Sequence, residues 1–420
     1  MRTLEGIVVQ KYGGSSVADP DRIRRVAQRV VATHRTGKPV VVVVSAMGDT
    51  TDHLIELAHQ ISARPPKREM DMLLSTGEQV SIALLAMAIQ ELGEEAISLT
   101  GAQVGIRTDS THMKARIQEV RTERILRELE QGRIVIVAGF QGIDELNDIT
   151  TLGRGGSDTT AVALAAALQA ERCEIYTDVD GVYTADPRVV PEAARLEWVA
   201  YGEMLELASL GAVVLQPRAV EYAAQYGVVL RVRSSFSDGP GTEVREVSPM
   251  ENARVVVGVT YDRNVAKVVV VDVPDRPGVA HQLFDALARE EINVDMIVQT
   301  TKAQQVTDVL FTVTWDDLPR ALEITDEVAR KLGATAVHHD ASVAKVSIVG
   351  AGMMSHPGVA ARMFGALGEA GINIHVISTS EIKVSCLIDE VHVEEAVRRV
   401  HRAFHLDQLG SAAAPKASQA

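Results

Sequence analysis

The stretch that most constrains the fold of this chain is a glycine-rich loop that runs directly into a helix-forming segment. Residues 150–160 read TTLGRGGSDTT, and residues 161–168 read AVALAAAL. Alanine and leucine have high helix propensities, so the loop is predicted to end at a helix N-terminus. Such a terminus presents unpaired backbone N–H groups and the positive end of the helix dipole, which attract carboxylates and phosphates.

Two roles for this loop are compatible with its residues. Its glycines would let a ligand approach the backbone closely, and Arg154 offers a planar fork of donors that fits a carboxylate or a phosphate. Alternatively, the loop is a structural turn in which Ser157 or Asp158 is the N-cap of the helix. The loop is therefore a candidate anion-binding site.

Composition limits the classes of function. The 420 residues are 46% hydrophobic and 23% charged, which predicts two or three globular domains. We expect a cytoplasmic protein without a membrane span or signal peptide, because no apolar run of about 18 residues and no charged-then-apolar leader occurs. Cys173 and Cys386 are far apart, which disfavours a disulfide framework or a zinc site. A net charge of −14 disfavours nucleic acid as a partner, so anionic ligands need local cations.

The first half of the chain alternates strand-like and helix-like segments. Residues 6–10 predict a strand, and a Gly-Gly-Ser-Ser turn and a helix that starts at Asp19-Pro20 follow it. Residues 40–44 and 134–138 are apolar runs typical of strands buried on both faces, and residues 174–176 predict a further strand. We therefore expect a doubly wound α/β domain with a mainly parallel sheet to about residue 245.

Polar residues gather where these strands end. Lys11 precedes Gly13 and Gly14, an order that differs from the Walker A motif but still combines backbone amides with a positive charge. The alternative is a solvated lysine at a strand end. Glu78, in the sequence STGE, either binds a ligand or favours the helix dipole from the first turn of an apolar helix.

Five motifs, in this order, resemble those of the aspartokinases: KYGGSS at 11–16, SAMGDTTD at 45–52, STGE at 75–78, TTLGRGGSDTT at 150–160 and TDVDGVYTADPR at 177–188. Related amino-acid kinases share a glycine-rich start but not the whole set. The resemblance implies an amino-acid-kinase domain over residues 1–247, with a three-layer αβα sandwich. It also implies that ATP and Mg²⁺ are used to phosphorylate the side-chain carboxylate of L-aspartate, the first step of lysine, threonine and methionine synthesis.

The resemblance assigns roles to individual positions. Lys11 would neutralise charge that develops during phosphoryl transfer, and Asp158 would help to orient the reacting groups. Glu78 would hold the amino group of aspartate, and Arg154 would hold a carboxylate. The other implied contacts are Thr51 and Ser157 for the substrate, and Gly13, Gly14, Ser45, Thr177, Asp178, Tyr183 and Arg188 for the nucleotide. No residue of the sequence is identified as a metal ligand.

One position departs from the aspartokinase pattern. Many relatives carry a lysine that contacts ATP in the sequence GAKVL, whereas residues 211–215 read GAVVL here, with Val213 in place of the lysine. This departure favours an alternative function, a non-catalytic amino-acid sensor of the same fold. The complete set of Lys11, Glu78, Arg154 and Asp158 favours the kinase.

An internal repeat follows residue 247. The sequence DRPGVA at 275–280 returns as SHPGVA at 355–360, and each copy predicts a strand, a Pro-Gly turn, a helix and two further strands. Each copy resembles the ACT domain, a ferredoxin-like α+β module that senses amino acids. The predicted divisions are a linker or first strand at 248–263, ACT domains at 264–337 and 338–409, and a disordered tail at 410–420.

Tandem ACT domains imply regulation. Effectors of aspartokinases bind between paired modules, so the resemblance implies threonine or lysine as effectors and a homo-oligomer formed through these modules. Met250 could start a separate regulatory chain, as in some relatives. The alternative at each position is that the residue only shapes a turn. The implied effector contacts are Asp275, Gly278, Val279, Asn293, Gln299, Asn373, Ile374, Ser380 and Glu381.

Overall fold

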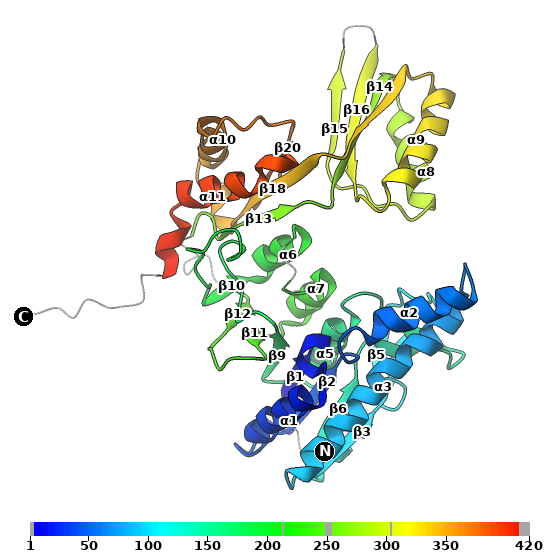
Figure 1. The fold of residues 1–420 in the computed structure, drawn as a ribbon, viewed down its shortest axis with the longest axis vertical. Coiled ribbons are helices and arrows are strands. Elements are labelled where there is room, and N and C mark those ends of the chain that lie inside the picture. Colours follow the sequence, from blue (N-terminus) through cyan, green and yellow to red (C-terminus); the bar gives the residue numbers. More distant parts are fainter. Residues whose placement is uncertain (1–3, 212–213, 248–253, 303–304, 411–420) are drawn as a thin grey trace, which may run out of the picture. The chain divides into compact units, whose positions relative to one another are not determined.

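The computed structural model describes residues 4–211, 214–247, 254–302 and 305–410, which divide into two compact units (Figure 1). The first unit contains most of the chain up to residue 247, and the second contains the residues from 254 onward. Residues 183–194 and 210–211 also belong to the second unit, although the sequence analysis placed a single boundary at residue 247. Val213, Met250 and residues 411–420 of the tail lie outside the described residues.

The first unit is built on an eight-stranded sheet with the order β10-β12-β11-β9-β1-β2-β6-β3. Neighbours from β11 to β3 pair in parallel, and β12 is antiparallel to β11. The predicted mainly parallel sheet is therefore confirmed. The strands are β1 (Val8–Tyr12), β2 (Val40–Val44), β3 (Ala96–Leu99), β6 (Ile134–Ala138), β9 (Arg172–Thr177), β10 (Trp198–Ala200), β11 (Leu230–Ser234) and β12 (Thr242–Arg245).

Both faces of this sheet are covered. Val40, Val42 and Val44 of β2 pack in one core with α1 (Pro20–His34) and α3 (Lys67–Glu91). Val41 and Val43, which point to the opposite face because side chains alternate along a strand, are equally buried. The helix α5 (Gly156–Ala167) packs against β1, β2 and β9, with α7 (Pro217–Tyr226) beside it. Buried strands of this kind are typical of parallel sheets between helices.

Smaller elements complete the first unit. Strands β5 (Ile117–Val120), β4 (Ile106–Thr108), β7 (Gln141–Ile143) and β8 (Ile149–Thr151) form a second sheet in that order. The remaining helices are α2 (Thr50–Ile61), α4 (Glu123–Glu130) and α6 (Tyr201–Ser209). By length and composition alone, α3 could cross a membrane, but half of its apolar window is buried and it packs against α1, α2, β3 and β6. We interpret it as a core helix.

The helix boundaries decide two of the alternatives left open by the sequence. The helix α5 begins at Gly156 with Gly155 as its N-cap, so the interpretation of Ser157 or Asp158 as the N-cap is wrong. The helix α3 begins at Lys67, directly after Pro66, and continues through Glu78. Residues 67–75 contain no glycine or proline to delay its start. Glu78 therefore lies in the middle of α3, and its proposed placement in a first turn is wrong.

The second unit contains two modules with antiparallel sheets. The first sheet has the order β15-β16-β14-β17 and the second β13-β18-β20-β19, so the predicted repeat of strand, helix and two strands is confirmed. The first module comprises β14 (Ala266–Pro274), α8 (Val279–Arg289), β15 (Ile297–Thr301), β16 (Val306–Val313), α9 (Leu318–Leu332) and β17 (Ala336–Asp340). The second comprises β13 (Gly258–Asp262), β18 (Val343–Val349), α10 (Val359–Glu369), β19 (Val376–Thr379), β20 (Lys383–Asp389) and α11 (Val393–Ala403).

Chain order and sheet order differ in this unit. Strand β13 precedes the whole first module in sequence but pairs with β18 of the second module. The first module is therefore an insertion between two neighbouring strands of the second. The predicted division at residue 337 falls within β17, which pairs with β14.

A segment that lies between strands of the first unit in sequence completes the core of the second module. The hydroxyl of Thr184 lies 2.9 Å from Nε2 of His401 on α11, and the backbone N–H of Val259 donates to the carbonyl of Thr184 at 2.7 Å. Val189 and Val190 are buried in the same hydrophobic core as Val397. Residues 183–194 are thus held by packing and hydrogen bonds within the second unit.

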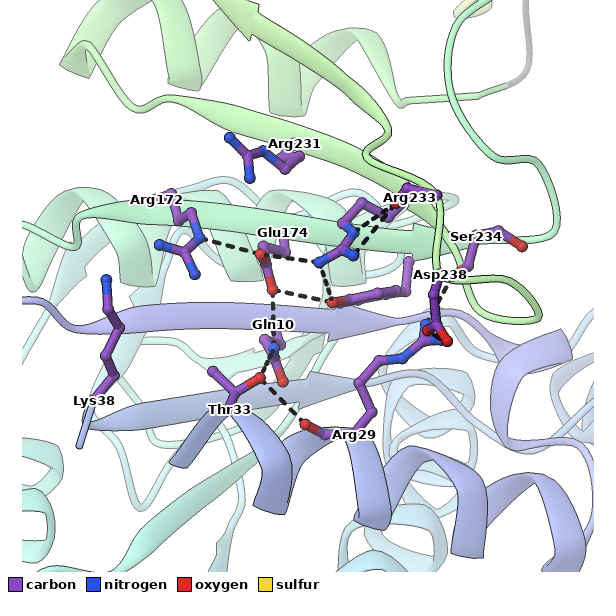
Figure 2. Close-up of polar contacts among 12 residues, drawn as sticks. Gln10, Arg29, Thr33, Lys38, Arg172, Glu174, Arg231, Arg233, Ser234 and Asp238 are labelled. Carbon is purple, nitrogen blue, oxygen red and sulfur yellow. Dashed lines mark hydrogen bonds and ion pairs between the residues drawn. The ribbon is translucent and has the colours of Figure 1, made fainter. Parts of the chain in front are cut away.

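A buried carboxylate joins three central strands of the first unit (Figure 2). Glu174 of β9 is 2% exposed, accepts from Gln10 of β1 at 2.9 Å and forms ion pairs with Arg172 at 3.1 Å and Arg233 of β11 at 3.5 Å. Burial pushes the pKa of Glu174 up, but the hydrogen bonds from Gln10 and Arg172 and the two positive charges outweigh burial and lower it from its ordinary value. The ionised carboxylate is therefore part of the folded structure.

We expect Glu174→Ala to lower the stability of the first unit by about 3 kcal/mol, because it removes the carboxylate from the buried donors of Gln10 and Tyr176 and from the Arg233 guanidinium. The measurement is the calorimetric unfolding of the full chain. Glu119→Ala, which removes an exposed ion pair with Arg121, is the matched control and should change stability by about 0.5 kcal/mol or less. Equal effects of the two substitutions would contradict this account.

Candidate active site

The carboxyl ends of the parallel strands meet at one edge of the sheet. Lys11 is in register with Val43 of β2 and Ile175 of β9, and Ser234 at the end of β11 is in register with Thr177. The glycine turn after β1, the loop after β2 and the Thr-Asp sequence at the end of β9 therefore leave the sheet at the same edge. Open α/β sheets bind their ligands at this edge.

Lys11 and Asp158 form an ion pair at the centre of this edge. The Lys11 ammonium lies 2.6 Å from Oδ1 of Asp158, and their side chains are 12% and 9% exposed. The alternative of a solvated lysine at a strand end is therefore wrong. Asp158 lies in the first turn of α5, where the helix dipole favours a negative charge. The ion pair places a positive charge beside the turn that contains Gly13 and Gly14.

The turn after β1 packs tightly against the loop after β2. The backbone N–H of Gly48 donates to the carbonyl of Gly14 at 3.1 Å, and the N–H of Ser45 donates to the carbonyl of Tyr12 at 3.1 Å. A Cβ atom on Gly14 would lie only 2.9 Å from the carbonyl oxygen of Ala46, so this approach requires glycine. Thr51, in the first turn of α2, follows this loop and is half-buried.

Glu78 is a buried carboxylate with an incomplete set of partners. It is 3% exposed, and Oε1 accepts from the backbone N–H of Ala46 at 3.2 Å. Its Oε2 has no hydrogen-bond partner among the described residues. Burial raises the pKa of Glu78 to about 8, although backbone hydrogen bonds oppose this shift. A buried carboxylate of this kind is suited to a cationic ligand.

The loop that carries Arg154, residues 151–156, is named the arginine loop here. Gly155 adopts a positive φ of +72°, and a Cβ atom there would lie 1.7 Å from Cγ of Gln216, so only glycine fits. Arg154 is exposed, whereas Ser157 is buried and closely approached by Gly139 at the end of β6. The loop thus presents an arginine to solvent from a tightly packed backbone.

The nucleotide candidates divide between the two units. The hydroxyl of Thr177, the last residue of β9 in the first unit, donates to Asp178 at 3.1 Å. Tyr183 and Arg188 belong to residues 183–194 of the second unit. The side chain of Arg188 is 89% exposed and forms an ion pair with Asp186 at 2.8 Å.

The effector candidates occupy equivalent positions in the two modules. Asn293 and Asn373 are both exposed and precede β15 and β19, and Val279 is buried in the core of the first module. A cleft of ≈ 330 Å³ lies between the modules, with Ile374 among its lining residues. The cleft is also lined by Asp308 and His375, which the sequence analysis did not identify. The remaining candidates, Asp275, Gly278, Gln299, Ser380 and Glu381, are exposed.

Comparisons with known proteins give the family. Residues 6–234 match the amino acid kinase family, and residues 267–330 and 346–404 match the ACT domain. An aspartokinase from Mycolicibacterium smegmatis is 55% identical over 406 residues, which cover 95% of this chain and 96% of that protein. This chain belongs to the aspartokinase family.

Two solved structures of E. coli aspartokinase III have the same fold as this aspartokinase. One is a complex with aspartate and ADP in the R-state, with 28% identity, a TM-score of 0.80 and coverage of 94% of this chain and 99% of that chain. The other is a complex with lysine and aspartate in the T-state, with 28% identity, a TM-score of 0.76 and coverage of 95% and 99%. The predicted amino-acid-kinase fold followed by ACT modules is therefore confirmed.

Two residues of this aspartokinase that hydrogen-bond the start of the arginine loop escaped the sequence analysis. Asp71 lies on α3 seven positions before Glu78, which places both carboxylates on the same helix face. This spacing could have identified Asp71 from the sequence. Arg218 lies in the first turn of α7 and hydrogen-bonds the carbonyl of Leu152. No local pattern distinguishes Arg218 from a surface arginine.

The raised pKa of Glu78 predicts how stability depends on pH. In the folded protein the Glu78 carboxyl keeps its proton to about pH 8, whereas a glutamate in the unfolded chain loses its proton near the ordinary pKa of 4.5. The contribution of Glu78 to the free energy of unfolding is therefore fully present below about pH 4.5. It is lost as the pH rises through 8, by at most about 1.4 kcal/mol per pH unit. We expect Glu78→Gln to have a higher melting temperature than the wild type at pH 9 and an equal one at pH 5.

The check is calorimetry of both proteins from pH 5 to 9. Glu69→Gln, which alters an exposed glutamate of the same helix, is the control and should leave the wild-type pH dependence unchanged. A constant difference between Glu78→Gln and the wild type at every pH would refute the buried titration.

Proposed function

We propose that this aspartokinase transfers the γ-phosphoryl group of ATP to the side-chain carboxylate of L-aspartate, giving 4-phospho-L-aspartate. This reaction is the first step of lysine, threonine and methionine biosynthesis, and we place it in the cytoplasm. The observation that carries the proposal is the buried Lys11–Asp158 ion pair at the same strand edge as Glu78, whose Oε2 has no partner among the described residues. The E. coli relative bound to aspartate and ADP supports this assignment.

Charge neutralisation is the main catalytic contribution of the chain. Negative charge spreads over the transferring oxygens during phosphoryl transfer, and the reaction needs positioned cations and N–H groups more than covalent catalysis. Lys11 supplies the cation, with the amides of Gly13 and Gly14 beside it, and Asp158 orients the Lys11 ammonium. Ser45, Thr177, Asp178, Tyr183 and Arg188 are the proposed nucleotide contacts.

Opposite charges hold the two ends of aspartate in this proposal. Glu78 receives the amino group and Arg154 receives a carboxylate, while Thr51 and Ser157 contribute hydrogen-bonding groups. The ammonium of the substrate would supply the partner that Glu78 lacks and would favour its ionised form. Aspartate binding near neutral pH would therefore release a proton from Glu78.

Mg²⁺ is proposed to enter with ATP. The described residues contain no cluster of three or more His, Cys, Asp or Glu side chains that could hold a metal. The edge does contain the carboxylates of Asp158 and Asp178, and Mg²⁺ usually binds one or two carboxylates together with substrate phosphates. Bound there, the ion would neutralise phosphate charge.

The experiment that tests the function is ADP release measured with L-aspartate, with L-glutamate and without an acceptor. We expect turnover with aspartate alone. Release of no ADP with any acceptor would instead support the non-catalytic amino-acid sensor, the alternative that Val213 favours.

Lys11→Met should lower kcat about 100-fold or more and change the KM for aspartate much less, because Lys11 is assigned to charge that develops during transfer. Steady-state kinetics with each substrate varied is the measurement. Lys38→Met, which removes a partly exposed lysine paired with Glu171, should retain the wild-type kcat. Ordinary turnover in Lys11→Met would remove Lys11 from the mechanism.

Feedback inhibition is proposed to act through the second unit. Threonine, lysine or both would bind the ACT modules, and the modules would also join two or more copies of the chain. A separate regulatory chain that starts at Met250 is a further proposed partner. Support comes from the E. coli relative, whose T-state complex contains lysine, and from the equivalent exposure of Asn293 and Asn373 in the two modules. An effector acts only by its different affinity for two states of the enzyme.

Full-length Asp275→Ala and Asn293→Ala should remain active and lose inhibition by threonine or lysine, because both side chains are exposed and assigned to the effector. Activity is measured against increasing concentrations of each amino acid. Asp326→Ala, an exposed aspartate on α9 of the same module, should keep the wild-type inhibition. Unchanged inhibition in both test variants would move the effector site elsewhere.

A further inference from the structure

A fully buried carboxylate on α3 ties together two loops beside the candidate substrate site. Asp71 is 0% exposed. Its Oδ1 accepts from the hydroxyl of Thr151 at 2.5 Å, and its Oδ2 lies 2.7 Å from Nδ1 of His112. The backbone N–H of Met113 lies 3.1 Å from both carboxylate oxygens. Because Thr151 is the first residue of the arginine loop, Asp71 fixes the point where that loop leaves β8.

Arg218 on α7 contacts the same two loops. One guanidinium nitrogen donates to the carbonyl of Leu152 at 3.0 Å, and another donates to the carbonyl of Ala115 at 3.1 Å. The N–H of Ala115 in turn donates to the carbonyl of Thr151 at 2.9 Å. Residues 112–115 and the start of the arginine loop thus form one hydrogen-bonded layer, held by a carboxylate from α3 and a guanidinium from α7.

The arrangement separates a fixed backbone from an exposed functional group. Arg154 lies two residues after Leu152 and is exposed, while Gly155 packs against the side chain of Gln216. Asp71 and Glu78 lie two turns apart on the same face of α3. A single helix therefore carries Glu78 directly and anchors the loop of Arg154, which fixes the separation of the two groups assigned to aspartate.

We propose that Asp71 and Arg218 are positioning residues that hold the arginine loop so that Arg154 meets the carboxylate of the substrate. This inference rests on the aspartate-binding role proposed for Arg154. A small displacement of a group that binds or positions a substrate costs up to about 100-fold in rate or affinity. The effect of removing either anchor should therefore be measurable. The ATP site is assigned to other loops, so its affinity should depend little on these anchors.

The test compares Asp71→Asn, Arg218→Met, Thr151→Val and Thr151→Ser in the full-length enzyme. We expect the first three to raise the KM for aspartate about 10-fold and to leave the KM for ATP within about twofold. Thr151→Ser keeps the hydroxyl that donates to Asp71 and should retain the wild-type KM. If Asp71→Asn fails to fold, the proposal is tested by Arg218→Met and by the comparison of Thr151→Val with Thr151→Ser.

A double-mutant cycle separates positioning from a general structural role. Combined with Arg154→Ala, Asp71→Asn and Arg218→Met should raise the KM for aspartate no further, because they act through Arg154. Glu128→Gln on α4 is the matched control: it alters a carboxylate that is 2% exposed and paired with Arg124 and Arg133. This control should lower the melting temperature and leave the KM for aspartate unchanged.

Two failures are distinguishable in this design. If Arg154→Ala leaves the KM for aspartate unchanged, the proposed substrate assignment itself is wrong. Two results would overturn the positioning role of Asp71 and Arg218 if Arg154→Ala does raise that KM. In the first, the anchor variants leave the KM for aspartate unchanged. In the second, they raise it by the same factor in the Arg154→Ala background as in the wild type.

Discussion

The in-register parallel pairing of β1 with β2 and β9 is the constraint on which the site depends. Parallel pairing sends every connection over a face of the sheet, so the helices cover both faces and the carboxyl ends gather at one edge. Lys11 reaches this edge from β1, and α5 brings Asp158 to it from a segment far away in sequence. The polar groups of the edge come from strands, loops and helices that are far apart in sequence, and the sheet brings them together.

Three buried carboxylates in the first unit illustrate different uses of buried charge. Glu174 is surrounded by donors and arginines, and Asp71 accepts from a hydroxyl and a backbone N–H and contacts His112. Glu78 receives only a backbone N–H on one oxygen, and its pKa is raised accordingly. The first two carboxylates stabilise the fold around the site. The burial of Glu78 instead lowers the stability of the folded protein, and a positively charged ligand would offset this cost.

Much of the fold was predictable because its signals are local. The apolar run at 40–44, the Asp19-Pro20 helix start and the repeated Pro-Gly turns all act on their neighbours, and the structure agrees with each of them. The beginning of α3 was predicted too late because Ser75-Thr76-Gly77 suggests a turn, whereas Gly77 packs against Ala46 inside the helix. Long-range contacts leave no local pattern. The bonds from Arg218 to the carbonyls of Leu152 and Ala115 depend on tertiary packing, as does the burial of Val189 and Val190 in the second unit.

The insertion of the first ACT module between β13 and β18 determines where the regulatory region can be cut. A polypeptide that starts after Asp262 would contain both repeats seen in the sequence, yet it would lack the strand that covers one edge of β18. The exposed N–H and C=O groups of β18 would then be open to pairing with another chain, and such edges promote aggregation. A fragment that keeps this edge of β18 covered must therefore begin no later than Gly258, and it would still lack Val189 and Val190 from the core of the same module.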